Sequence, residues 1–551
     1  MNETLLNKVI YQIYPRSFMD SNNDGIGDIQ GIISKLDYIK TLEVDYIWLS
    51  PIYKSPNFDN GYDISSYFEI NEEFGTMEDF HQLIEESKKR DIKIIMDLVI
   101  NHTSWEHEWF KLSKDINSKY HNYYIYKDGI NKSKKNIKGD VPNNWTSFFG
   151  GSAWEYDDIT SKYYLHLFAK EQPDLNYDNE EVYNETVKVI KFWIDKGVSG
   201  FRCDVINLLG KTDYSNGKFK GGLTGYDKYV STHKSHKILR RLQEEVFGPK
   251  KILTIGETVF STVKDANIFT NKKALELDMI FSFEHMEIDA IFLKWFHRKV
   301  RFKRLINVLA KWQTEVKQNA IYFENHDQPR SISRWFKKYD ERQAKLLGLL
   351  LFSLKGTTFI YQGEEIGMTN YPFSTFDEIR DIESKNVYEI LTKNFKVPKK
   401  SAFKIIKKVS RDNARTPMQW ENELNASFSG AEPWINVNKN LSYINVLNEI
   451  NDSNSTLNFY KKLIKFKHEN NILKYGDFRL NKVNNKYAII ERIYQNKVLG
   501  FIFNFTGKKT KLVLDFDILF TTNSSLKENK NFLLPYEGLV YQRKKNINDE
   551  I

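Results

Sequence analysis

The chain has 551 residues, of which 41% are hydrophobic and 15% aromatic, and its formal net charge is +9. This length suits two or three domains, or one large barrel with additions. The 81 basic residues are spread along the chain beside 72 acidic ones. A nucleic-acid-binding protein concentrates its basic residues on one stripe, so we expect no nucleic-acid partner.

Cysteine content and hydropathy indicate the compartment. The single cysteine, Cys203, rules out a disulfide within the chain and is typical of a reducing cytoplasm. The first 15 residues show no basic segment followed by an apolar run, and no window approaches ~18 apolar residues. We therefore expect a cytoplasmic, monomeric protein with no membrane partner.

Eight short apolar runs rich in β-branched and aromatic residues predict buried strands. They lie at 9–15, 46–51, 92–102, 200–206, 252–257, 279–283, 320–327 and 358–365. Amphipathic segments such as 77–90 and 182–197 lie between them and predict helices. Because buried strands that alternate with helices form a parallel sheet, eight such units predict a (β/α)8 TIM barrel of the α/β class.

Two segments interrupt this alternation. A long polar and aromatic stretch at 103–171 predicts an inserted domain, the B domain, on the C-terminal face of the barrel. From residue 476 onward, runs at 486–493, 497–505 and 509–516 predict a C-terminal antiparallel β domain. We therefore expect three domains. The barrel is formed by residues 1–102 and 172–475, the B domain by residues 103–171, and the C-terminal β domain by residues 476–551.

Polar residues follow the predicted strands at their C-terminal ends, where barrel enzymes carry their active sites. The ends of strands three, four, five and seven supply Asp97, His102, Arg202, Asp204, Glu257, His326 and Asp327. One such residue alone is more often part of a salt bridge or a cap than a catalyst. Three carboxylates that converge from separate strands predict a catalytic site.

Strand alternation separates the two reactive residues of GFRCDVIN, residues 200–207. Arg202 and Asp204 point to one face and Cys203 points to the other, so we interpret Cys203 as a small buried apolar residue. We expect Arg202 to lower the pKa of Asp204 and hold it ionised, as a nucleophile requires. We expect Glu257, on the next strand, to face an apolar wall that keeps it protonated. Two such carboxylates, about 5–5.5 Å apart, are the equipment of retaining glycoside hydrolysis.

From about Val9 into the C-terminal domain, the chain resembles the α-amylase superfamily of glycoside hydrolases, glycoside hydrolase family 13. The resemblance rests on DLVINH (97–102), QPDLN (172–176), GFRCDVIN (200–207), GET (256–258) and ENHD (324–327). It implies that Asp204 is the nucleophile, Glu257 the acid/base and Asp327 the transition-state stabiliser.

The resemblance also implies a pocket for one terminal glucose. Its side chains come from DNGYD, from the motifs above and from RDNARTPMQW, and they are Asp59, Tyr62, His102, Arg202, His326 and Arg411. Asp97 is expected to orient Arg202 without reacting itself.

Among subfamilies, the chain most resembles oligo-1,6-glucosidases and dextran glucosidases, on SPNFDNGYDISSY, YLHLFAKEQPDLN, YQGEEIGMTN and RDNARTPMQW. This implies a retaining, exo-acting α-glucosidase, with isomaltose and short isomalto-oligosaccharides as its small-molecule substrates. Val205, after the nucleophile, is then expected to crowd an α-1,4-linked second sugar. The segment 208–237 departs from the family pattern and borders the leaving-group side.

Two alternatives stay open. Trehalose-6-phosphate hydrolases share most of these motifs and also carry Val at position 205, and the Lys and His residues at 228–237 could bind a phosphate. A solvated helix face is the simpler explanation of those residues. A non-catalytic member of the superfamily, such as a transporter heavy chain, is disfavoured because all three carboxylates are present and no membrane anchor is visible.

A second motif, DSNNDGIGD, predicts a metal loop. Asp20, Asn22, Asp24 and Asp28 stand at positions 1, 3, 5 and 9 of an EF-hand-like loop, where oxygen ligands suit Ca²⁺, and the Ile26 carbonyl is a further ligand. The twelfth position is not Glu, so this is no EF-hand, and an acidic turn is the alternative. The family resemblance favours a structural Ca²⁺. We expect no organic cofactor.

Overall fold

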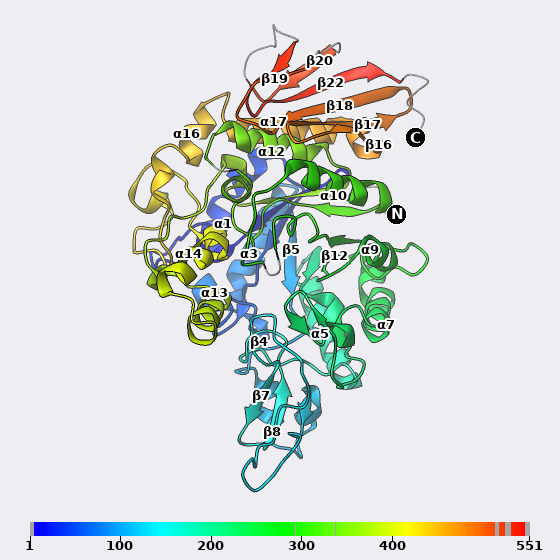
Figure 1. Cartoon of the computed structure of the whole chain (residues 1–551), viewed down its shortest axis with the longest axis vertical. Helices are drawn as coiled ribbons and strands as arrows, with labels where there is room; N and C mark the ends of the chain where they lie inside the picture. Colours follow the sequence, from blue (N-terminus) through cyan, green and yellow to red (C-terminus); the bar gives the residue numbers. More distant parts are fainter. Residues whose placement is uncertain (1–4, 292–293, 337, 513–516, 524–530, 546–551) are drawn as a thin grey trace.

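The computed structural model of the chain describes residues 5–291, 294–336, 338–512, 517–523 and 531–545. At its centre is a closed barrel of eight parallel strands in the order β1-β2-β5-β9-β12-β13-β14-β15, which confirms the predicted TIM barrel (Figure 1). The strands are β1 (Val9–Ile13), β2 (Tyr46–Leu49), β5 (Lys93–Leu98), β9 (Gly200–Cys203), β12 (Leu253–Glu257), β13 (Met279–Phe281), β14 (Asn319–Ile321) and β15 (Thr357–Tyr361).

Several barrel strands are shorter than the runs that predicted them. The run at 320–327 yields a strand only to Ile321, and Asp327 lies in a turn in which its backbone N–H donates to the Asn325 side chain at 2.9 Å. The run at 92–102 likewise ends as a strand at Leu98. Residues 99–102 and 322–326 are as buried as the strands that precede them. Their apolar character therefore did not show where each strand ends. The polar residues beyond these strands therefore lie on loops at the barrel mouth.

Helices surround the barrel (Figure 1). Those that follow the barrel strands include α1 (Ile29–Ser34), α2 (Leu36–Thr41), α3 (Met77–Lys89), α5 (Glu180–Asp195), α7 (His233–Leu242), α9 (Val263–Phe269), α10 (Phe302–Glu315) and α12 (Arg342–Ser353). In α3, Thr76 forms a capping box with Asp79, and Phe80 and Leu83 are buried toward the barrel. The two helices predicted at 77–90 and 182–197 are present within two residues of those limits.

The B-domain segment forms its own small sheet at the bottom of Figure 1. Its three antiparallel strands have the order β6-β8-β7, namely β6 (Tyr126–Lys127), β8 (Lys162–Leu165) and β7 (Trp154–Asp157), and α4 (Glu108–Ser113) precedes them. Trp145 and Trp154 of this segment share an apolar cluster with Val205, Leu208 and Tyr229. The insertion is therefore packed onto the chain that follows the fourth barrel strand. Its limits at 103–171 stay a prediction.

A second excursion from the barrel, which the sequence did not separate, follows β15. It contains α13 (Ile382–Glu389), α14 (Lys399–Val409), α15 (Asp412–Arg415) and α16 (Val446–Asn451), before α17 (Thr456–Glu469) and α18 (Asn471–Tyr475). This segment matters for the site because it places Arg411 and Arg415 at the barrel mouth, where both contact Asp327.

The C-terminal domain lies at the top of Figure 1, at the opposite end from the B domain. Its five-stranded antiparallel sheet, as predicted, has the order β16 (Asp477–Val483), β17 (Tyr487–Tyr494), β18 (Lys497–Asn504), β22 (Gly538–Lys544) and β20 (Asp517–Thr521). Of the run at 509–516, β19 (Thr510–Lys511) pairs with β21 (Phe532–Leu533), and residues 513–516 lie outside the described part. Among the described residues, we find no helix of the length and apolarity that a membrane span requires.

Candidate active site

The core of the site is one arginine that binds three carboxylates. The register of β9 and β12 places Asp204 and Glu257 level with each other, each one residue beyond the last paired position. Arg202 Nη1 donates to Asp97 Oδ1 at 2.8 Å and to Asp204 Oδ1 at 2.5 Å, and Nη2 donates to Glu257 Oε2 at 2.6 Å. The guanidinium is buried, so water does not weaken these charge-assisted bonds. Asp97 therefore orients Arg202, as expected.

The ionisation of this pair differs from the expectation. Burial raises the pKa of Asp204 well above its ordinary value; Arg202 lowers it, but the carboxylates of Glu257 and Asp97 and a hydrogen bond to Glu257 raise it further. Glu257 faces no apolar wall, because its Oε2 also accepts from the Val205 backbone N–H at 3.3 Å. One guanidinium cannot neutralise three carboxylates. The excess of carboxylates around Arg202 therefore makes Asp204 easier to protonate than the sequence led us to expect.

Cys203 is the buried bystander that strand alternation predicts. It is 1% exposed and belongs to the main core, and its Sγ lies 3.8 Å from the carbonyl oxygen of Phe201. Burial raises the pKa of the thiol, which disfavours the reactive thiolate.

Val205 turns the chain out of the strand. Its φ and ψ are 35° and 40°, in the left-handed region that β-branched residues rarely adopt. The side chain is 5% exposed and packs with Leu208 and Tyr229. Little of the side chain therefore remains available to contact a sugar.

Asp327 is held as a permanent anion. Its Oδ1 accepts from Arg415 Nη2 at 3.1 Å and from Arg411 Nη1 at 3.3 Å, and its Oδ2 lies 3.1 Å from His326 Nε2. Burial alone would raise the pKa of Asp327, but His326, Arg411 and Arg415 together lower it well below its usual range. A fixed anion suits the stabilisation of positive charge that develops on a sugar ring.

His326 and Tyr62 form the floor of the site. The Tyr62 hydroxyl lies 2.7 Å from His326 Nε2 and donates to Asp97 Oδ2 at 3.1 Å, and the two rings stack with centroids 5.3 Å apart. Gln12 Nε2 lies 2.8 Å from His326 Nδ1, and Trp48 Nε1 donates to Asp97 at 3.0 Å. This floor links the Arg202 cluster to Asp327.

Arg411 closes the opposite side. Its Nη2 donates to Asp59 Oδ1 at 2.8 Å, its Nε donates to Asp381 Oδ1 at 2.8 Å, and its guanidinium lies over the Phe149 ring at 5.1 Å. Asp381 also accepts from backbone N–H groups at the start of α13. An ion pair therefore joins the chain after β2 to the excursion after β15 beside Asp327.

His102 completes the ring of predicted residues. Its Nε2 lies 3.1 Å from the Tyr62 carbonyl oxygen and 3.1 Å from Gln172 Nε2, and Gln172 donates to Asp59 at 3.3 Å. Burial lowers the pKa of His102, so the ring is neutral. The structure thus joins all nine residues predicted for catalysis or sugar binding in one polar network.

The sequence reasoning missed several residues of this network, namely Gln12, Trp48, Gln172, Arg415 and Asp381. Gln172 is the first residue of the QPDLN motif, so the motif itself could have identified it. Arg415 lies four residues after Arg411, and residues four apart share a helix face, so it too could have been found. Asp381 stands in no quoted motif, and only the fold brings it to Arg411.

The predicted metal loop is a tight turn built on its own side chains. Asp20 accepts from the backbone N–H groups of Asn22, Asn23 and Gly25 at 2.7–3.0 Å. Asp28 accepts from Gly31 N at 2.6 Å and caps α1.

The remaining predicted ligands lie within the same turn. Asp24 Oδ1 accepts from Ile26 N at 2.8 Å, and Asn22 Nδ2 donates to Asp24 Oδ2 at 3.0 Å. Across the described residues, no group of three or more His, Cys, Asp or Glu side chains is arranged to hold a metal. The donor set is nevertheless all oxygen, which is the chemistry Ca²⁺ requires.

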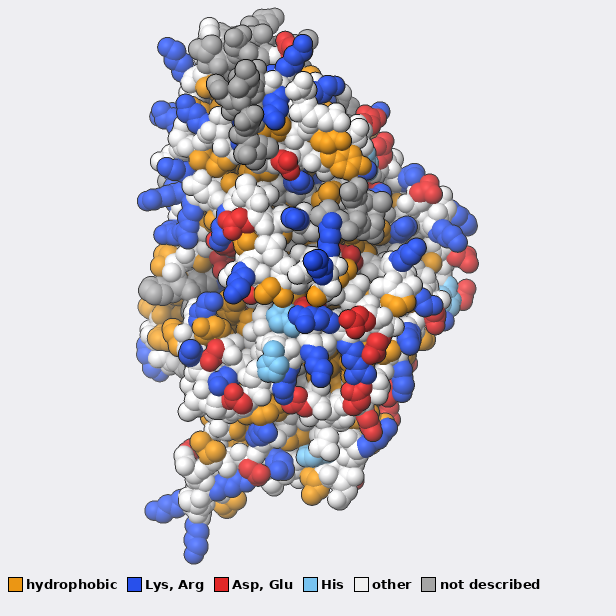
Figure 2. Space-filling view, turned by 90° about the vertical axis from the view of Figure 1, so that its right-hand side faces the viewer, with side chains coloured by type: hydrophobic (Ala, Val, Ile, Leu, Met, Phe, Trp, Pro, Cys, Tyr) orange, Lys and Arg blue, Asp and Glu red, His pale blue; other side chains and the backbone are white. Residues whose placement is uncertain are grey.

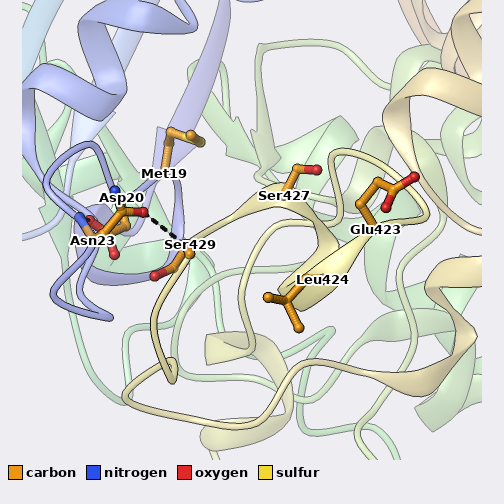
Figure 3. Close-up of a pocket in the computed structure, with 8 residues that line it drawn as sticks. Met19, Asp20, Asn23, Glu423, Leu424, Ser427 and Ser429 are labelled. Carbon is orange, nitrogen blue, oxygen red and sulfur yellow. Dashed lines mark hydrogen bonds between the residues drawn. The ribbon is translucent and has the colours of Figure 1, made fainter.

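A cavity of about 310 Å³ lies beside this loop (Figure 3). Met19, Asp20 and Asn23 face Ser427 and Ser429 across it. Asn23 Oδ1 accepts from Gly430 N at 2.9 Å, so this contact joins the N-terminal loop to the excursion after β15. The arrangement is remote from Asp204 in the chain and shares no residue with the catalytic network.

Paired carboxylates at the ends of neighbouring barrel strands, with a third anion held by two arginines, define a barrel glycoside hydrolase. Residues 12–476 match the alpha-amylase family, described as alpha amylase, catalytic domain, and the chain belongs to that family.

The chain is also similar over nearly its whole length to individual proteins. The chain is 44% identical to an oligo-1,6-glucosidase of Parageobacillus thermoglucosidasius, with 97% of this chain and 98% of that protein covered. It is 41% identical to a trehalose-6-phosphate hydrolase of Bacillus subtilis (strain 168), with 97% of each covered. The crystal structure of Bacillus licheniformis trehalose-6-phosphate hydrolase superposes with a TM-score of 0.90 at 41% identity, with 98% of this chain and 99% of that chain covered.

Proposed function

We propose that this protein is an exo-acting α-glucosidase that hydrolyses α-1,6-glucosidic bonds of isomaltose and short isomalto-oligosaccharides, with retention of configuration. The observation that carries the proposal is the pair Asp204 and Glu257, level on adjacent strands and bridged by Arg202. Adjacent parallel strands are ~4.8 Å apart, which matches the carboxylate spacing of retaining and not of inverting glycosidases.

Double displacement needs one protonated carboxyl group and one carboxylate anion at this pair. With the proton on Glu257, the Asp204 carboxylate attacks the anomeric carbon while Glu257 protonates the glycosidic oxygen, and the leaving sugar departs as an alcohol. Glu257, now an anion, takes a proton from water, whose oxygen attacks the same carbon and releases glucose and free Asp204. Two displacements restore the α configuration. Asp327 stabilises the positive charge of both transition states.

The closed side of the site supports the exo-acting part of the proposal. The Arg411–Asp59 ion pair and the Phe149 ring bound the pocket where a longer chain would have to continue past the terminal glucose. Asp59, Arg411 and His102 are buried and offer donors and acceptors for sugar hydroxyls. Among the relatives, the name oligo-1,6-glucosidase supports the linkage.

The alternative is hydrolysis of trehalose 6-phosphate, which the names of other relatives favour. The basic residues that suggested a phosphate site do not favour it. Lys228 pairs with Asp213 at 3.0 Å, Lys234 with Asp178 at 2.6 Å, and His236 with Glu276 at 2.7 Å. Figure 2 shows this side of the molecule, where basic and acidic side chains are interspersed. Each of these three side chains therefore already has an acidic partner within the protein.

The deciding experiment is a comparison of kcat/KM for isomaltose, panose, maltose, sucrose, trehalose and trehalose 6-phosphate. We expect isomaltose to be preferred over maltose by tens of fold or more, because steric discrimination of a linkage amounts to ~1–3 kcal/mol. A clear preference for trehalose 6-phosphate would overturn the α-1,6 assignment and leave the roles of Asp204 and Glu257 intact.

We also propose that the loop of Asp20, Asn22, Asp24, Ile26 and Asp28 holds a structural Ca²⁺. Asp20 Oδ2, Asp24 Oδ1 and Asp28 Oδ2 each accept one backbone hydrogen bond, which leaves each a lone pair for a cation. The residues fit an oxygen-coordinated ion of this kind, and the loop takes no part in the chemistry.

A further inference from the structure

The segment after β9, which departs from the family pattern, sends one lysine into the protein interior. Lys211 is 3% exposed, and its Nζ lies 2.7 Å from Asp174 Oδ2. The same Nζ donates to Asn101 Oδ1 at 3.0 Å. Neither partner is exposed to solvent. A buried ammonium of this kind persists only where charge and hydrogen bonds offset its desolvation.

The bonds of Lys211 fix the orientation of the Asn101 amide. An ammonium can only donate, so the atom that faces it must be the amide oxygen. The amide nitrogen then carries two hydrogens. It donates to Asp174 Oδ2 at 3.1 Å, and it lies 3.3 Å from His102 Nδ1. Asp174 Oδ1 is also occupied, because it accepts from Leu167 N at 2.9 Å. The flipped amide would place two donors against each other at Lys211 and two acceptors against each other at Asp174.

The amide in turn fixes the proton of His102. Because Asn101 donates to Nδ1, that nitrogen carries no hydrogen and the proton of the neutral ring lies on Nε2. Nε2–H then donates to the Tyr62 carbonyl oxygen, and the two hydrogens of the Gln172 amide are directed to that same oxygen and to Asp59 Oδ2. We propose that Lys211 is a positioning residue which, through Asn101, holds His102 as the Nε2–H tautomer, hydrogen-bonded to the Tyr62 carbonyl oxygen beside the proposed sugar site.

This inference rests on the proposed function only in taking His102 as a sugar-binding residue. The charges that act on His102 come from three elements: Asp174 and Asp59, which raise its pKa, and Lys211, which lowers it. Loss of the Lys211 charge leaves Asp174 unbalanced beside the ring. Lys211 therefore favours both the neutral form and one tautomer of that form.

The test compares Lys211→Met with Lys211→Arg and with Lys467→Met. Lys467 is a matched control, because it is a buried lysine at the opposite end of the barrel that donates to Gly356 O and Thr358 Oγ1. With any α-glucoside that the wild type hydrolyses, we expect Lys211→Met to raise KM at least tenfold with a smaller loss in kcat, and Lys211→Arg to restore most of the affinity. We expect Lys467→Met to lower the melting temperature and leave KM unchanged.

Two further readouts separate positioning from plain structural support. In ¹⁵N spectra of the ring nitrogens, assigned by a His102→Gln variant, the wild type should show Nε2–H, and Lys211→Met should show both tautomers. In the pH profile of kcat/KM, the rise on the acidic side should move to higher pH in Lys211→Met. In the double variant Lys211→Met/Asp174→Asn it should return to the wild-type position. A wild-type Nδ1–H tautomer, or a Lys211→Met enzyme that loses only melting temperature, would overturn the inference. Because any hydrolysed glucoside serves, failure of the α-1,6 assignment would not affect this result.

Discussion

Substitution at Cys203 and at Asp204 should separate stability from catalysis, although the two residues are adjacent. In Cys203→Ser the new hydroxyl would be buried on the outer face of β9. The carbonyl oxygen of Phe201 lies 3.8 Å from the Sγ, and a hydroxyl on the shorter C–O bond would not reach it. An unpaired buried hydroxyl costs about 1–3 kcal/mol. Asp204→Asn keeps the shape of the side chain and removes the attacking oxygen anion.

The size of the expected effect follows from chain length. Unfolding entropy of ~2.1 cal/mol/K per residue gives about 1.2 kcal/mol/K for 551 residues. Cys203→Ser should therefore melt about 1–3 °C below the wild type, with kcat/KM within twofold. Asp204→Asn should lose nearly all turnover and melt at or above the wild-type temperature, since it removes one of three carboxylates around Arg202. Thermal melts and kcat/KM for isomaltose are the assays. The reasoning fails if Cys203→Ser loses activity at an unchanged melting temperature, or if a thiol reagent inactivates the folded wild type and spares Cys203→Ser.

Three further predictions concern stability and specificity. Added Ca²⁺ should raise the melting temperature of the wild type and not of Asp24→Ala, since a ligand of the folded state alone stabilises it; identical melts of both proteins, with and without Ca²⁺, would exclude the metal. Burial lowers the pKa of Lys467 to about 7, so the unfolded chain binds one more proton between about pH 7 and 10, and stability should rise with pH there by about 1.4 kcal/mol per unit. Lys467→Met should lack this pH dependence of stability. Equal slopes in the wild type and in Lys467→Met would contradict the assignment of the slope to Lys467. Val205→Ala should raise kcat/KM for maltose relative to isomaltose by up to about tenfold, the low end of steric discrimination, because the side chain is nearly buried; an unchanged ratio would assign Val205 to packing alone.

Local periodicity accounts for what the sequence predicted well. Strand alternation placed Cys203 away from Asp204, and apolar runs between amphipathic helices were enough for the barrel. The raised pKa of Asp204 was not predictable in this way, because it depends on burial and on the carboxyl groups of Glu257 and Asp97, which neighbouring strands bring to Arg202. Pairwise reasoning along one strand counted one cation and one carboxyl group, whereas the fold assembles one cation and three carboxyl groups.

The missing parts have a similar cause. The excursion after β15 has short helices and no long apolar period, so the motif around Arg411 could be recognised but its route to the pocket could not. Lys211 carried no sequence signal, since a lysine in a polar segment is ordinarily exposed. Only the contact with Asp174, which returns from the inserted segment, makes it a buried residue.

The ion pair between Asp59 and Arg411 joins positions 352 residues apart, and this has a consequence for biosynthesis. A ribosome adds about 5–20 residues per second, so Asp59 is made roughly 20 to 70 s before its partner. During that interval the nascent chain can carry all the early strands and both reacting carboxylates, yet it lacks the guanidinium groups that balance Asp59 and Asp327. Enzymatic activity should therefore appear only after release of nearly the whole polypeptide, and ribosome-stalled chains ending before Arg411 should be inert however well their strands have formed.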